Sequence, residues 1–188
     1  PSPAESAQLG DVEAGEWIAV TLHRFAAADS ALAHEVAAQL AAVATATGAR
    51  LLFVPHEETS GGWDASFNHA VASLLPRAVE AAVCPLLPPR VVRWLTARAA
   101  MVVSSRLHPL VFGLSAGVPC LAIHADEYCR IKLRGVLAQA EQREELCLPL
   151  FDAGNGELAR RALLLWDRRH EVRAFLLSVV TVVLGGFV

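Results

Sequence analysis

Short apolar segments alternate with helix-like segments along most of this 188-residue chain. The strand-like segments are residues 17–22, 50–55, part of 80–87, 101–104, 119–123 and a short stretch near 146–150. The helix-like segments between them are residues 31–47, 64–75, 89–98 and 109–116, and the chain is mostly helical from about residue 128. Strands that alternate with helices form right-handed βαβ units and a parallel sheet. The alternation therefore predicts an α/β fold, a Rossmann-like parallel sheet with helices on both faces.

The composition supports a packed domain and argues against a nucleic-acid partner. Apolar residues make up 54% of the chain and charged residues 19%, as expected for a sheet that is covered on both faces. The net charge of −3 is too small to imply a polyanion partner. The four cysteines form no CxxC pair and have no metal-like spacing with histidine. They predict a reduced, cytoplasmic protein without a metal site.

The two ends of the chain differ from its middle. We expect a linker at 1–15, a Rossmann-like domain at 16–173 and an apolar tail at 174–188. Because the chain begins Pro-Ser-Pro without an initiator methionine, we expect a piece of a longer protein. The tail is shorter than the ~20 residues that span a bilayer, and we expect it to pack on the domain as a terminal helix or strand. Contact with a missing domain and contact with a membrane are the alternatives.

The segment 101–123 predicts a strand, a tight turn, a short helix and a second strand. Its only charge-capable residues, Arg106 and His108, lie in the turn before Pro109. Ligands of open α/β sheets bind at the carboxyl ends of the strands, where helix N-termini favour anions. Arginine grips carboxylate or phosphate with two hydrogen bonds, and histidine transfers protons near neutral pH. The turn predicts an anion site beside a proton-transfer group, unless Arg106 pairs with a structural carboxylate and His108 caps the helix.

The run SRLHPLVFGLSAGVPCLAI at 105–123 resembles the hallmark of the polysaccharide pyruvyl transferase family, and a looser similarity extends from residue 17 to about 137. The resemblance implies the C-terminal, donor-binding half of a GT-B fold. Members of the family transfer a pyruvyl group from phosphoenolpyruvate, as a ketal, to sugar hydroxyls in the biosynthesis of exopolysaccharides and other cell-wall glycans.

The same resemblance suggests partners. Phosphoenolpyruvate is the donor substrate, and no cofactor is implied. A glycan or lipid-linked saccharide is the acceptor. It would bind through an N-terminal domain that has no counterpart in this chain, so the resemblance implies that the isolated domain is inactive.

The resemblance also assigns roles to residues of the turn. Arg106 would hold the phosphate or carboxylate of the donor, and His108 would contact the donor and serve in acid–base catalysis. Ser105 and Leu107 would lie against the donor. Arg24, which follows the first strand, would be a second donor-binding cation.

The chain departs from the family pattern after the last strand of this segment. Many members have a Tyr-Asp pair closely followed by lysine, whereas this chain reads His-Ala-Asp-Glu-Tyr-Cys-Arg-Ile-Lys at 124–132. Asp126, Tyr128 and Lys132 are candidate equivalents, and we expect Asp126 and Lys132 to bind substrate. As alternatives, Asp126 caps the next helix and Lys132 is a surface residue.

Other functions remain open on the sequence alone. One is a GT-B nucleotide-sugar glycosyltransferase or epimerase domain, although no Gly-rich diphosphate loop follows the first strand. Another is a non-catalytic remnant or interaction module. The loop after the second strand contains His56, Glu57, Glu58 and Asp64, but their spacing fits no metal site and loop polarity alone explains them.

Overall fold

The computed structural model describes residues 16–23, 30–57, 63–150 and 155–185. Its strands are β1 (Trp17–Thr21), β2 (Arg50–Phe53), β3 (Ala81–Val83), β4 (Met101–Ser104), β5 (Cys120–His124) and β6 (Cys147–Pro149). Its helices are α2 (Ser30–Thr47), α3 (Trp63–Ser73), α4 (Pro89–Thr96), α5 (Leu107–Ser115), α6 (Glu127–Gln139), the short 3-10 helix η1 (Glu144–Leu146), α7 (Glu157–Asp167) and α8 (Arg169–Gly185).

The strands form one parallel sheet in the order β3-β2-β1-β4-β5-β6. This is the strand order of a Rossmann fold, and it confirms the predicted fold class. Strand β1 lies in the middle, where Val20 pairs with Phe53 of β2 on one side and with Val103 of β4 on the other. The strand order reverses between β1 and β4, so the ligand-binding crevice of such a fold lies outside the carboxyl ends of these two strands.

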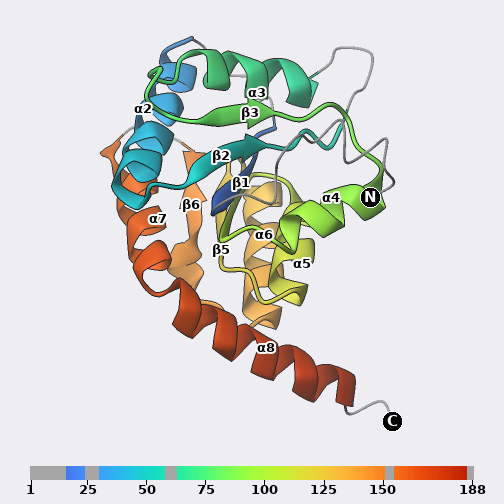
Figure 1. The fold of residues 1–188 in the computed structure, drawn as a ribbon. Helices are drawn as coiled ribbons and strands as arrows, with labels where there is room; N and C mark the ends of the chain where they lie inside the picture. The colour runs from blue at the N-terminus through green and yellow to red at the C-terminus, as the bar shows by residue number, and fades with distance from the viewer. Residues whose placement is uncertain (1–15, 24–29, 58–62, 151–154, 186–188) are drawn as a thin grey trace.

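Helices cover both faces of the sheet, because the central strands are apolar on both sides (Figure 1). In β1, Ile18 and Val20 face a core shared with α2, α3 and α7. Trp17 and Ala19 face the other core, which is built with α4, α5, α6 and Leu176 of α8. Burial on both faces explains why these strands are continuous apolar runs rather than alternating ones.

Helix α5 begins two residues earlier than the sequence predicts. Arg106 is its N-cap residue, with extended backbone angles, and Pro109 is its third residue. Proline is tolerated there because the N–H groups of a first helical turn have no intrahelical partner. The earlier start places His108 inside the helix rather than at its cap.

The structure describes most of the expected tail at 174–188 and none of the expected linker at 1–15. Residues 174–185 continue α8 without a break, and Leu176 is fully buried against the domain. In Figure 1 the far end of α8 extends beyond the body of the domain. Residues 1–15 and 186–188 lie outside the described residues. Among the helices that the structure describes, none combines the length and the apolar character needed to cross a bilayer.

Candidate functional site

The ends of β1 and β4 are joined by hydrogen bonds at the point where the strand order reverses. The Ser105 N–H donates to the Thr21 carbonyl at 2.9 Å, and the His23 N–H donates to the Ser105 hydroxyl at 2.7 Å. The Ser105 hydroxyl also donates to the Thr21 carbonyl at 3.4 Å. Ser105 is buried, and its contacts fix the two strand ends against each other.

The turn that follows β4 is held by Ser104. Its hydroxyl accepts a hydrogen bond from the Arg106 N–H and donates one to the Arg106 carbonyl, both at 3.0 Å. A serine that bonds the backbone two residues away closes a tight turn. This turn directs the chain into α5 and leaves the Arg106 side chain at the carboxyl edge of the sheet.

The Arg106 guanidinium binds two carboxylates. Its Nε donates to Asp64 Oδ2 at 3.1 Å and its Nη2 to Asp64 Oδ1 at 2.7 Å, so that the two planar groups form a fork. The same Nη2 donates to Glu57 Oε2 at 2.6 Å. Burial alone would lower the pKa of Arg106, but the hydrogen bonds and charges of Asp64 and Glu57 raise it. Arg106 therefore pairs with a structural carboxylate, as the alternative interpretation of the sequence held.

Asp64 is fixed in place by its surroundings. Its side chain is 0% exposed, and its Oδ2 also accepts a bond from the His56 N–H at 3.4 Å. One turn further along α3, buried Asn68 donates to the Asp64 carbonyl at 2.6 Å and to the Leu22 carbonyl at 2.8 Å. Asn68 also accepts from the Leu22 N–H at 3.2 Å. These bonds tie the start of α3 to the end of β1.

Four of the seven histidines lie at the carboxyl ends of neighbouring strands. His56 follows β2, His23 follows β1, His108 follows β4 and His124 ends β5. Burial lowers the pKa of His56 to about 4, and the nearby His108 and Arg106 add to the effect. Burial and the Arg106 charge also lower the pKa of His23. At neutral pH these two imidazoles are therefore neutral groups beside a permanent cation.

The exposed member of this group is His108, in the first turn of α5. Its ring lies 6.3 Å from the Phe112 ring, measured between centroids. Leu107, the first residue of the helix, is partly buried and packs against the core behind it. The structure thus brings the predicted residues Ser105, Arg106, Leu107 and His108 together at one edge. Arg24 lies outside the described residues.

The other two predicted ligands sit at the start of the next helix. Asp126 is the N-cap of α6, where its carboxylate accepts the Cys129 N–H at 2.7 Å, and this bond lowers its pKa. Lys132 is exposed, with its Nζ 4.0 Å from the centre of the Tyr128 ring. The alternatives given above, a helix cap and a surface lysine, are therefore confirmed as their structural roles.

The Arg106 cluster consists of Arg106, Asp64, Glu57, His56 and Asn68, which are linked by hydrogen bonds. The sequence analysis gave no functional role to His56, Glu57 and Asp64, and it did not single out Asn68. The loop after β2 was interpreted as polar surface, but β2 neighbours β1 and brings this loop against the turn after β4. One sequence feature could have indicated this role: Asp64 is an acidic residue in the first turn of α3, the helix that follows β2. In the ranges that the structure describes, no three His, Cys, Asp or Glu side chains are placed to hold a metal ion.

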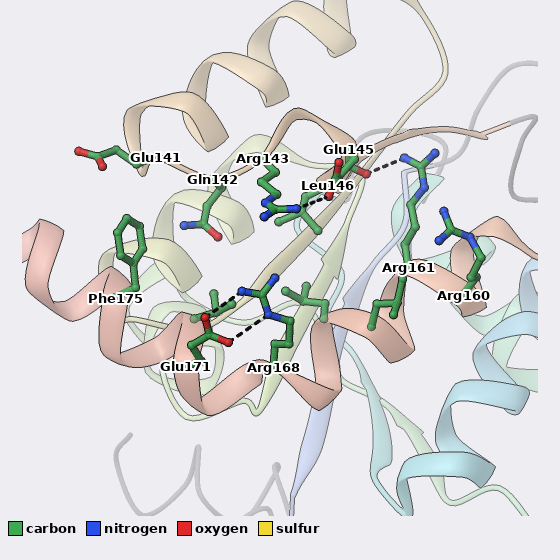
Figure 2. A pocket seen from close by; sticks show the side chains of 13 residues that line it. Glu141, Gln142, Arg143, Glu145, Leu146, Arg160, Arg161, Arg168, Glu171 and Phe175 are labelled. Atoms are coloured by element: carbon green, nitrogen blue, oxygen red, sulfur yellow. Dashed lines mark hydrogen bonds and ion pairs between the residues drawn. The ribbon is translucent and has the colours of Figure 1, made fainter.

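A separate cavity of about 640 Å³ lies at the opposite edge of the sheet. It is lined by residues of η1, which precedes β6, and by α7 and α8. Figure 2 shows Arg143 and Arg168 pointing toward one another across it. Each is already paired with a glutamate, Arg143 with Glu145 at 3.3 Å and Arg168 with Glu171 at 2.8 Å. The cavity contains none of the residues predicted for the site.

Two comparisons relate this chain to known proteins. Residues 18–126, more than half of the chain, match the sequence profile of the polysaccharide pyruvyl transferase family. That range includes the ends of β1, β2, β4 and β5 and therefore the whole Arg106 cluster. No curated protein sequence gives a significant match.

Solved structures of low sequence identity share the fold. A putative UDP-N-acetylglucosamine 2-epimerase from Listeria monocytogenes superposes with a TM-score of 0.61 and 15% identity over 89% of this chain and 41% of its own. Os79 from O. sativa in complex with UDP superposes with a TM-score of 0.57 and 12% identity, over 90% of this chain and 37% of its own. A ugt transferase from Siraitia grosvenorii in complex with UDP superposes with a TM-score of 0.57 and 11% identity, over 96% of this chain and 42% of its own. The fold is thus GT-B-like, and this chain spans about two fifths of the length of these structures.

Proposed function

This chain belongs to the polysaccharide pyruvyl transferase family, and from that membership we propose that it binds phosphoenolpyruvate and serves in pyruvyl transfer. The pyruvyl group would be transferred as a ketal to sugar hydroxyls of a cell-surface polysaccharide. A further domain would complete the acceptor site, so the isolated chain would bind the donor without turning over. We place the reaction in the cytoplasm, in keeping with the free state of all four cysteines.

The observation that carries this proposal is the position of Arg106. It is the N-cap of α5 at the switch point of the sheet, where a helix N-terminus and a guanidinium meet. Phosphoenolpyruvate carries a carboxylate and a phosphate, and a guanidinium N–H forms charge-assisted hydrogen bonds with the oxygens of either group. The alternative occupant is the diphosphate of a nucleotide sugar. It uses the same helix terminus but has no carboxylate.

The reaction requires one proton at the donor carbon and a stabilised leaving group. Two sugar hydroxyl oxygens bond to C2 of the enolpyruvyl group, C3 gains a proton to become a methyl group, and inorganic phosphate leaves with the second proton. His108 is exposed in the first turn of α5 and is the group that would deliver the proton to C3. Arg106 would stabilise the charge on the departing phosphate.

Equilibrium titration of the purified chain tests this function. We expect phosphoenolpyruvate to bind in preference to UDP. Arg106→Lys keeps the charge but removes the planar group that Asp64 orients toward the ligand, so the affinity for phosphoenolpyruvate should fall by at least about tenfold. His108→Ala should also weaken binding. Arg130→Lys is the matched control, because Arg130 lies on α6 and pairs with Glu127.

Two results would contradict the proposal. One is unchanged phosphoenolpyruvate binding in both Arg106→Lys and His108→Ala. The other is a preference for UDP, which would assign the chain to nucleotide-sugar chemistry instead. Absence of binding to either ligand would support a non-catalytic module.

A further inference from the structure

We propose that Glu57 is an exchangeable carboxylate that occupies the anion position on Arg106 and leaves when the donor binds. The inference rests on the proposed function, because it takes Arg106 as the anion-binding residue. It makes Glu57 a residue that sets how tightly the site binds anions.

The two carboxylates on Arg106 are held very differently. Asp64 is 0% exposed and bonds both Nε and Nη2, whereas the Glu57 side chain is 43% exposed and bonds Nη2 alone. Asp64 also receives the His56 N–H and begins a helix that Asn68 ties to β1. Exposed ion pairs contribute little to stability, so Glu57 can leave at little cost. Asp64 remains and keeps the guanidinium oriented.

The charges around Arg106 favour binding of an anion only after Glu57 has left. One guanidinium with two carboxylates carries a net charge of −1, which repels an incoming anion. Once Glu57 leaves, Arg106 and Asp64 form a neutral pair, and a ligand oxygen takes the vacated place on Nη2. The positive end of the α5 dipole adds to the attraction for the ligand.

Every anion that takes the place of Glu57 meets the same cost of displacing it. A simple carboxylate such as pyruvate replaces one carboxylate by another and gains little. A phosphate carries more charge and forms stronger charge-assisted bonds with a guanidinium. Glu57 therefore lowers the affinity for both kinds of anion, and only a ligand that bonds Arg106 more strongly than a plain carboxylate does binds well.

The test compares four anions on three proteins. Wild type, Glu57→Gln and Glu127→Gln are titrated with phosphoenolpyruvate, inorganic phosphate, pyruvate and UDP. Glu127 is the matched control, because it is an exposed glutamate near the same edge that pairs with Arg130 instead. Thermal melting checks that all three proteins are equally folded.

We expect Glu57→Gln to tighten binding of each bound anion by about fivefold, the equivalent of removing one exposed ion pair. The gain should be similar for each of these anions, and Glu127→Gln should leave every affinity unchanged. An unchanged or weaker affinity in Glu57→Gln would overturn the proposal. An equal gain in Glu127→Gln would also overturn it, since the effect would then be general electrostatics.

The failure of this inference is distinguishable from the failure of the proposed function. The ratio of the affinity of Glu57→Gln to that of wild type, measured with any anion that binds, tests whether Glu57 is displaced. The preference between phosphoenolpyruvate and UDP tests the function. If Glu57→Gln tightens UDP but neither protein binds phosphoenolpyruvate, Glu57 is exchangeable and the function is wrong. If no anion binds to any of the three proteins, both are wrong.

Discussion

The Arg106 guanidinium pairs with one buried carboxylate, Asp64, and one exposed carboxylate, Glu57. The two ion pairs should contribute unequally to the free energy of unfolding. Asp64→Asn removes the charge that compensates Arg106 at its buried side, so it should lower the free energy of unfolding by about 2–3 kcal/mol. Glu57→Gln should lower it by less than about 1 kcal/mol, because Glu57 is 43% exposed. Urea unfolding of both variants measures the difference.

The control for that comparison is Glu80→Gln. Glu80 forms an exposed pair with Arg50 at 3.2 Å, at the other edge of the sheet, and its loss should resemble the loss of Glu57. If Asp64→Asn were as stable as Glu80→Gln, the buried fork would contribute nothing to holding α3 against β1.

His56 should make the stability of the fold depend on pH. Its pKa is lowered by burial to about 4 in the folded chain, against an ordinary value of 6.5 for a solvated histidine. Because the unfolded chain binds the proton more tightly, this contribution is present above about pH 6.5 and is lost as the pH falls toward 4. Between about pH 7 and pH 5, wild type should lose about 2 kcal/mol more than His56→Gln.

Urea unfolding at a series of pH values checks this, with His69→Gln as the control. His69 is exposed on α3, so that variant should follow the wild-type curve. His23 also has a lowered pKa and leaves some pH dependence in every variant. Parallel curves for wild type and His56→Gln would show that His56 is not kept neutral in the folded state.

Residue-level prediction from the sequence succeeded for local patterns and failed for contacts between loops. The Ser-Arg-Leu-His turn identified Arg106 because its residue types and its place before a helix are local features. Asp64 and Glu57 are more than forty residues away, and their contact with Arg106 depends on β2 lying beside β1. Periodicity along one segment carries no information about that neighbour.

At the scale of elements, α5 approaches the sheet closely because of one glycine. A Cβ at Gly113 would lie 2.7 Å from Cys120 Sγ and 3.0 Å from Val102 Cγ2. Gly113→Ala should therefore destabilise the domain by about 1–3 kcal/mol through overpacking. Since α5 carries Leu107 and His108 in its first turn, the same change should also weaken anion binding at Arg106.

Gly135 in α6 is the matched control for this glycine. A Cβ there has no heavy atom within 4 Å, so Gly135→Ala should stabilise the helix by about 0.5–1 kcal/mol. Thermal melting of both variants gives the comparison. Destabilisation by Gly135→Ala, or its absence in Gly113→Ala, would contradict the packing described for these helices.

Element boundaries were predicted to within a few residues because the apolar runs and their breakers are local signals. Met101–Ser104 matches the predicted strand, whereas α5 begins at Leu107 rather than Pro109. The difference arises because proline marks a first helical turn without specifying which position in that turn it takes. Ser104, by closing the turn on Arg106, determines the position here.

At the scale of the whole molecule, the strand order explains why distant loops meet. Alternating strands and helices predicted a parallel sheet but did not specify which strands are neighbours. The order β3-β2-β1-β4-β5-β6 brings the ends of β2, β1, β4 and β5 together in one row. The four strand-end histidines, Arg106 and its two carboxylates therefore share one edge, while the arginine-lined cavity occupies the other (Figure 2).

A crystal structure of this chain with phosphoenolpyruvate tests the account most directly, through the distance from the ligand oxygens to Arg106. We predict a carboxylate or phosphate oxygen within about 3.2 Å of an Arg106 guanidinium nitrogen, with Asp64 still on Nε and Glu57 displaced from Nη2. Phosphoenolpyruvate bound between Arg143 and Arg168 at the opposite edge, or bound without touching Arg106, would contradict the account.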